Sequence, residues 1–101
     1  MVYHGVNLPL EQIAELCRQH HIRRLALFGS ILSDEFRPDS DVDVLVEFEP
    51  GKTPGLVFFG IEAELTDLIG RRVDLNTANS LSRYFREEIL AEAKTIYAEE
   101  A

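Results

Sequence analysis

Two aspartates one residue apart, Asp41 and Asp43, begin the run DVDVLVEF, whose other members are mostly apolar. In a β-strand, residues i and i+2 project to the same side, so both carboxylates would point at one spot. Like charges brought together are costly unless a counter-charge neutralises them, and paired carboxylate oxygens suit Mg²⁺. The pair indicates a metal site, although D-x-D pairs also occur on solvated strands at sheet edges.

A third carboxylate, Asp74, interrupts another short apolar segment, between Val73 and Leu75. If that segment is a strand beside the first, with Asp74 on the same face, three carboxylates meet. A third carboxylate can complete a metal site or act as a general base toward an attacking hydroxyl. We therefore expect Asp41, Asp43 and Asp74 to be both catalytic residues and metal ligands.

An independent candidate is the pair Gly29-Ser30, which follows the apolar run RRLALF. A glycine at a strand end lets a phosphate approach bare backbone N–H groups, and the serine hydroxyl adds a further donor. The pair is not a Walker A loop, because no Gly-Lys-Ser/Thr follows it. Gly-Ser is also an ordinary turn, so its role in phosphate binding depends on the other motifs.

The elements that must position these residues follow from the hydrophobic periodicity. Strands are expected where apolar runs are short or alternate, and helices where apolar residues recur at i, i+3 and i+4. The expected strands are 23–29, 41–48 and 71–77, and the expected helices are 7–22, a short 30–35, 56–69 closed by Gly70, and a last helix capped by Ser82 that includes Ile96. This order predicts an α/β (α+β) fold, in which a short mixed sheet of about three strands is covered by about four helices.

Length and composition limit the class of protein. At 101 residues we expect one domain, 1–101, with a modest core. A formal net charge of −8 argues against direct nucleic-acid binding, which needs a basic surface. Cys17 is the only cysteine, so an internal disulfide is excluded. No apolar run approaches membrane-spanning length and the N-terminus does not read as a secretion signal, so we expect a cytoplasmic protein without membrane contact.

Taken together, Gly29-Ser30, a ten-residue spacing, Asp41-x-Asp43 and the later Asp74 resemble the motif of the polymerase-β-type nucleotidyltransferase superfamily. The similarity runs almost end to end. Within the superfamily it is nearest to the minimal nucleotidyltransferases, the MNT or MntA-like antitoxins of two-gene toxin–antitoxin pairs. The full motif with its spacing is much more specific than any of its parts.

This resemblance implies that ATP binds with its phosphates against Gly29 and Ser30, and that Mg²⁺ is held by Asp41 and Asp43. It also implies that Asp74 aligns or deprotonates the attacking hydroxyl while pyrophosphate leaves. In the antitoxin family the acceptor is a tyrosine of a partner HEPN ribonuclease toxin, which AMPylation silences. The expected function is therefore AMP transfer by an antitoxin that forms a hetero-oligomer with its toxin.

The loop after the serine departs from the family pattern. Members commonly read G-S-R-A-R-G, whereas here Ile31 and Ser33 replace the arginines and Asp34 replaces the glycine. The length is unchanged. These departures predict an altered rate or acceptor specificity more than a loss of metal binding, and Arg37 is one candidate for compensating positive charge.

Two alternative functions remain open from the sequence. The chain could neutralise a toxin by occlusion without catalysis, and its charge of −8 would steer it toward a basic ribonuclease. It could also modify a small molecule or an RNA, but its charge disfavours RNA and its length leaves little material for further pocket walls. The intact carboxylate set favours the enzyme over the occluding module.

Overall fold

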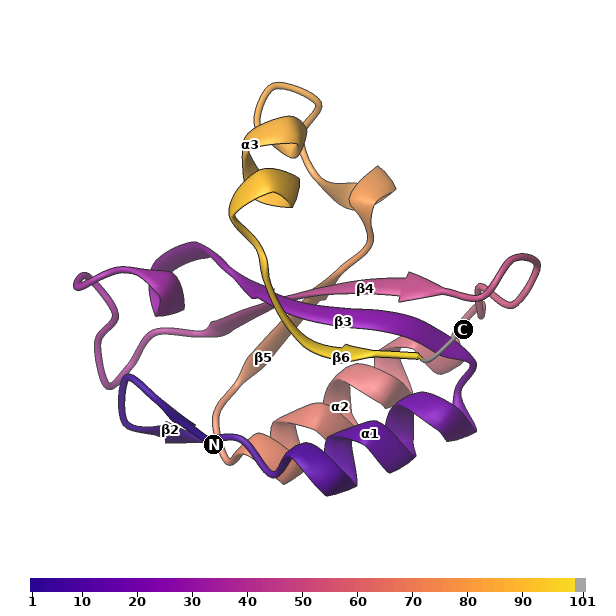
Figure 1. The fold of residues 1–101 in the computed structure, drawn as a ribbon, viewed down its shortest axis with the longest axis horizontal. Coiled ribbons are helices and arrows are strands. Elements are labelled where there is room, and N and C mark those ends of the chain that lie inside the picture. Colours follow the sequence, from indigo (N-terminus) through magenta and orange to yellow (C-terminus); the bar gives the residue numbers. More distant parts are fainter. Residues whose placement is uncertain (100–101) are drawn as a thin grey trace.

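In a computed structural model, which describes residues 1–99, the chain forms a four-stranded mixed sheet and a small two-stranded hairpin (Figure 1). The larger sheet has the order β5-β4-β3-β6, with β4 and β5 parallel and the other neighbours antiparallel. Its strands are β3 (Ile22–Phe28), β4 (Val42–Phe48), β5 (Val73–Asn76) and β6 (Lys94–Ala98). Because β4 and β5 are parallel, both strands begin at the same end of the sheet.

Two helices, α1 (Leu10–Gln19) and α2 (Val57–Ile69), cover one face of the sheet, and α3 (Arg86–Glu92) stands on the other face (Figure 1). The C-terminus of α2 was predicted correctly. Gly70 adopts a left-handed φ of 74°, and its N–H donates to the carbonyl of Thr66 at 2.9 Å. Within residues 1–99, no helix has both the length and the apolar character needed to cross a bilayer.

The two faces of the sheet bury very different numbers of apolar side chains. In the described residues, the cluster beneath α1 and α2 contains seventeen buried residues, among them Val42, Val44 and Val46 of β4. The cluster beneath α3 contains three, which are Ala26, Phe28 and Leu45. The strand alternation predicted for β4 is thereby confirmed, since its valines and Leu45 lie on opposite faces.

The prediction of a long last helix is wrong. The helix ends at Glu92, and residues Lys94–Ala98 form β6, which pairs antiparallel with β3 through Arg24↔Ala98 and Leu25↔Tyr97. A strand here satisfies the second edge of β3, and this gain overrides the apolar spacing that favours a helix. Ile96 consequently packs against the cluster beneath α1 and α2, away from α3.

The counts of elements also differ from the prediction. Within residues 1–99 there are four strands in the main sheet and three α-helices, against the three and four expected. The short helix expected after Gly29 is a single 3₁₀ turn, Gly29–Leu32. The hairpin of β1 (Val2–Tyr3) and β2 (Val6–Asn7) was not predicted, because two-residue strands carry no periodicity.

Candidate active site

The parallel ladder between β4 and β5 places two of the predicted carboxylates side by side. Asp43 of β4 is the direct register partner of Asp74 of β5. Both neighbours of Asp74 are buried on the α1–α2 side, so the two aspartates project to the α3 side of the sheet. The condition set by the sequence, adjacent strands with both carboxylates on one face, is met for this pair.

The third aspartate, Asp41, lies one residue before β4 and is solvent-exposed. Its carboxylate Oδ2 is 3.9 Å from Nε of Arg72, which immediately precedes β5. Across the described residues, no three His, Cys, Asp or Glu side chains are already gathered as a metal-binding group. Mg²⁺ is commonly held by one or two carboxylates, with waters and substrate phosphates as its remaining ligands.

Gly29 lies against the carboxylate of Asp43. It follows β3, whose last residue Phe28 is the register partner of Asp43, and it has a φ of +77°. A Cβ built on Gly29 would overlap Oδ2 of Asp43 and lie 3.1 Å from its Cγ. Both the backbone conformation and the close approach require glycine at this position. The predicted phosphate-binding pair Gly29-Ser30 is thus adjacent to the paired aspartates.

The electrostatics of the site centre on Asp43. Burial, together with the smaller effects of the neighbouring Asp74 and Asp41 charges, raises the pKa of the Asp43 carboxyl to about 6. Within the described residues Arg72 lies near Asp41, but neither Asp43 nor Asp74 forms a salt bridge. Such a donor set, hard oxygens sharing uncompensated charge, fits a divalent cation.

The loop that leads into Asp41 is held by a residue that the sequence did not single out for function. Arg71 donates from one guanidinium nitrogen to the carbonyls of Arg37 at 3.0 Å and Ser40 at 2.6 Å. The same guanidinium lies over the ring of Phe36, 4.8 Å from its centroid. Arg71 is therefore more than a solvated charge at the entry to β5, because it fixes the loop that leads into Asp41.

A second unpredicted set of contacts holds β5 in register. The N–H of Val73 donates to Oγ1 of Thr66 at 3.1 Å, and the N–H of Leu75 donates to Oε2 of Glu62 at 2.8 Å. Both acceptors lie on α2. These two bonds flank Asp74 in the sequence, so they fix the strand segment that carries it.

Two of the three residues that depart from the family pattern, Ile31 and Ser33, serve the fold. Ile31 is fully buried in the cluster beneath α1 and α2. Ser33 closes the turn, since its hydroxyl donates to the carbonyl of Ser30 at 3.0 Å and accepts from the N–H of Glu35 at 3.2 Å. Ile31 therefore points away from the carboxylates.

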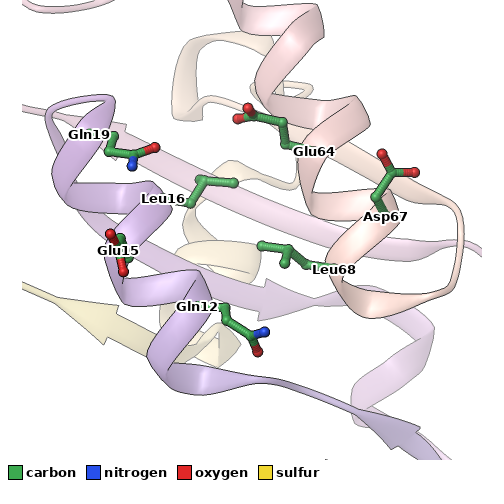
Figure 2. Close-up of a pocket in the computed structure, with 7 residues that line it drawn as sticks. All are labelled: Gln12, Glu15, Leu16, Gln19, Glu64, Asp67 and Leu68. Carbon is green, nitrogen blue, oxygen red and sulfur yellow. The ribbon is translucent and has the colours of Figure 1, made fainter.

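Cavities lie on both sides of the sheet. On the α3 side, a cavity of about 300 Å³ extends from Gly29 to α3, and it is lined by Phe28, Gly29, Phe85, Glu88, Ile89 and Glu92. On the opposite side, a groove of about 350 Å³ runs between α1 and α2, where Leu16 and Leu68 point toward each other and Glu15, Glu64 and Asp67 line the rims (Figure 2). Only the first of these two is adjacent to Gly29.

Comparison with known proteins identifies the family of this chain. The family described as "Polymerase beta, Nucleotidyltransferase" matches residues 11–101. The protein adenylyltransferase MntA of Thermococcus cleftensis is 36% identical, over 84% of this chain and 93% of its own length. A Methanocaldococcus jannaschii protein, provisionally named a protein adenylyltransferase, is 34% identical over 88% of this chain and 95% of its own length.

Solved structures of nucleotidyltransferases and of a toxin–antitoxin complex are similar in fold to this chain. A structure provisionally described as a minimal nucleotidyltransferase is 39% identical, with a TM-score of 0.68 over 83% of this chain and 85% of that chain. A toxin–antitoxin complex with AMP-PNP superposes with a TM-score of 0.72 over 92% of this chain and 76% of that chain, at 20% identity, which supports the fold alone. The chain belongs to the polymerase beta family of nucleotidyltransferases, as its motifs predicted, and is itself a nucleotidyltransferase.

Proposed function

We propose that this chain is an antitoxin that transfers AMP from ATP to a tyrosine hydroxyl of a partner HEPN-type ribonuclease toxin. The relative from Thermococcus cleftensis is named as a protein adenylyltransferase. A further structure of the same fold is described as a tri-AMPylated Shewanella oneidensis HEPN toxin in complex with an MNT antitoxin. The observation that carries the proposal is the register pairing of Asp43 with Asp74 beside Gly29.

In this proposal the hydroxyl oxygen of the acceptor forms a bond to the α-phosphorus of ATP. The bond from that phosphorus to the bridging oxygen breaks, and its electron pair leaves with pyrophosphate. Asp74, which is exposed, orients the hydroxyl and accepts its proton. Gly29 and Ser30 receive the phosphates at the end of β3, where the backbone is accessible.

Asp41 and Asp43 would hold Mg²⁺, with Asp74 as a further ligand. When bound, the ion neutralises charge on the triphosphate and makes the α-phosphorus more electrophilic. The fit is supported by the raised pKa of Asp43, because a cation would stabilise the ionised form that burial and neighbouring charges disfavour. Arg71 would keep Asp41 in place by holding the loop 36–40.

Metal binding can be tested without measuring activity. We expect Mg²⁺ to raise the thermal midpoint of the wild-type chain, because a ligand that binds only the folded state stabilises it. Asp43→Asn should abolish this increase, and Asp67→Asn, on the α1–α2 side, should retain it. An equal increase in all three proteins would place the ion elsewhere.

Transfer can be tested by mass spectrometry with purified chain, a candidate HEPN-family toxin, ATP and Mg²⁺. We expect the HEPN protein to gain one or more AMP units. Asp43→Asn should reduce the rate by about a thousandfold or more, while Asp67→Asn stays near wild type. If wild type transfers nothing, or if Asp43→Asn still protects cells from the toxin, neutralisation by occlusion is supported instead.

A further inference from the structure

Two exposed apolar patches stand out on the described surface, one just before α3 and the other at the start of α2. Tyr84 and Phe85, just before α3, are 79% and 59% exposed. Leu56, Val57 and Phe59, at the start of α2, are 86%, 57% and 64% exposed. Adjacent exposed aromatic rings contribute little to folding and are the side chains most enriched in binding hot spots.

Only the first patch is continuous with the candidate active site. Phe85 lines the cavity of about 300 Å³ that reaches Gly29, the residue in contact with Asp43. Its ring occupies the N-cap position of α3, where a hydrogen-bonding side chain would serve the helix better. A phenylalanine at this N-cap does not stabilise α3, and its exposed ring is available for contact with another molecule.

The cavity has an apolar floor and an acidic wall. Phe28 and Ile89 supply apolar surface, while Glu88 and Glu92 of α3 supply two carboxylates. Glu88 and Glu92 are not among the proposed Mg²⁺ ligands, so these carboxylates repel a triphosphate and disfavour the nucleotide as occupant. The cavity favours an apolar side chain accompanied by a basic one.

We propose that Tyr84, Phe85 and the cavity behind Phe85, together called the α3 surface, are the docking surface for the acceptor protein. An apolar side chain of the acceptor enters the cavity, and a neighbouring lysine or arginine lies beside Glu88 and Glu92. Docking there brings the acceptor next to Gly29 and hence to the reacting phosphate. This inference rests on the proposed function, because a protein must supply the hydroxyl.

The test is a titration of the HEPN-family toxin of the proposed function into wild type and variants, measured by calorimetry without nucleotide. We expect Tyr84→Ala and Phe85→Ala to weaken binding at least about tenfold. Replacing both carboxylates of the acidic wall, in the double variant Glu88→Lys with Glu92→Lys, should weaken binding further. The introduced lysines would repel the basic residue of the acceptor. Phe59→Ala is the matched control, since its ring is exposed to a similar degree on the other patch.

A parallel titration with AMP-PNP and Mg²⁺ separates the acceptor from the nucleotide. We expect Phe85→Ala to leave nucleotide affinity within about twofold of wild type. Weaker nucleotide binding with unchanged HEPN affinity would overturn the proposal and assign the cavity to ATP. Equal losses in Phe59→Ala and Phe85→Ala would also overturn it. If wild type binds through the α3 surface yet transfers no AMP, the proposed function fails while the docking surface stands.

Discussion

The two faces of the sheet are built differently, although they share the same strands. Beneath α1 and α2 lie seventeen of the buried apolar residues described, whereas three lie beneath α3. The paired aspartates and the cavity at Gly29 are on the thinly covered side. A sparse cover leaves room for a substrate, and the dense opposite core supplies the stability that such a site lacks.

Leucine-to-alanine variants on the two faces test this comparison most strongly. Leu65 of α2 is fully buried, so Leu65→Ala should lower the free energy of unfolding by about 2–5 kcal/mol. Leu90 of α3 is only partly buried, and Leu90→Ala should cost about 1 kcal/mol. Chemical denaturation measures both. Equal losses would mean that α3 carries as much of the core as α2.

Two glycine variants separate backbone strain from the geometry of the site. Gly29→Ala should lower the transfer rate by about a hundredfold, because the added Cβ displaces the carboxylate of Asp43. Gly70→Ala has a similar φ, +74°, but its Cβ meets open space, so it should lose about 1 kcal/mol of stability and keep its rate. Initial rates and thermal midpoints distinguish them. A normal rate for Gly29→Ala would contradict a catalytic role for the Asp43 carboxylate in the position where it contacts Gly29.

Removing Arg71 should make the loop before Asp41 less ordered and leave the hydrophobic core intact. Arg71→Ala loses both carbonyl contacts of the loop 36–40, and we expect about a tenfold slower transfer, or about 1.4 kcal/mol. Arg23→Ala, which removes an exposed charge paired with Glu47 at 3.7 Å, is the control. Kinetics at saturating and limiting ATP measure the effect. Identical behaviour of the two variants would mean that Arg71 has no positioning role.

A further prediction concerns the dependence of stability on pH. The pKa of Asp43 is about 6 in the folded chain against 3.8 as the ordinary value, so the unfolded chain loses this proton first. Its contribution to stability is therefore complete below about pH 4 and is lost as the pH rises to about 6. In metal-free buffer, wild type should lose stability relative to Asp43→Asn as the pH rises through this interval. A constant difference would contradict the raised pKa.

Sequence reasoning succeeded where the signal was local. The alternation of β4 placed its valines and Leu45 on opposite faces, and Gly70 marked the end of α2. It failed at β6, because the segment that pairs with β3 contains Ile96 at a spacing that also suits a helix. Pairing between strands so distant in sequence leaves no local pattern to read.

The same contrast between local patterns and long-range contacts holds for the candidate site. The sequence could name Asp43 and Asp74 from their apolar surroundings and could state the pairing that would unite them. It could not identify Arg71 as the support of the loop before Asp41, because a guanidinium reaching backbone carbonyls more than thirty residues away has no motif. Glu62 was missed for the same reason, since its partner is a backbone N–H.

The bonds from Thr66 and Glu62 to β5 also affect how the molecule meets other copies of itself. β5 is an outer strand of the sheet, and unpaired N–H groups on an outer strand recruit strands from neighbouring molecules. The N–H groups of Val73 and Leu75 are already occupied by side chains of α2. The edge that carries Asp74 is therefore less able to recruit a further strand, so self-association through this edge is disfavoured.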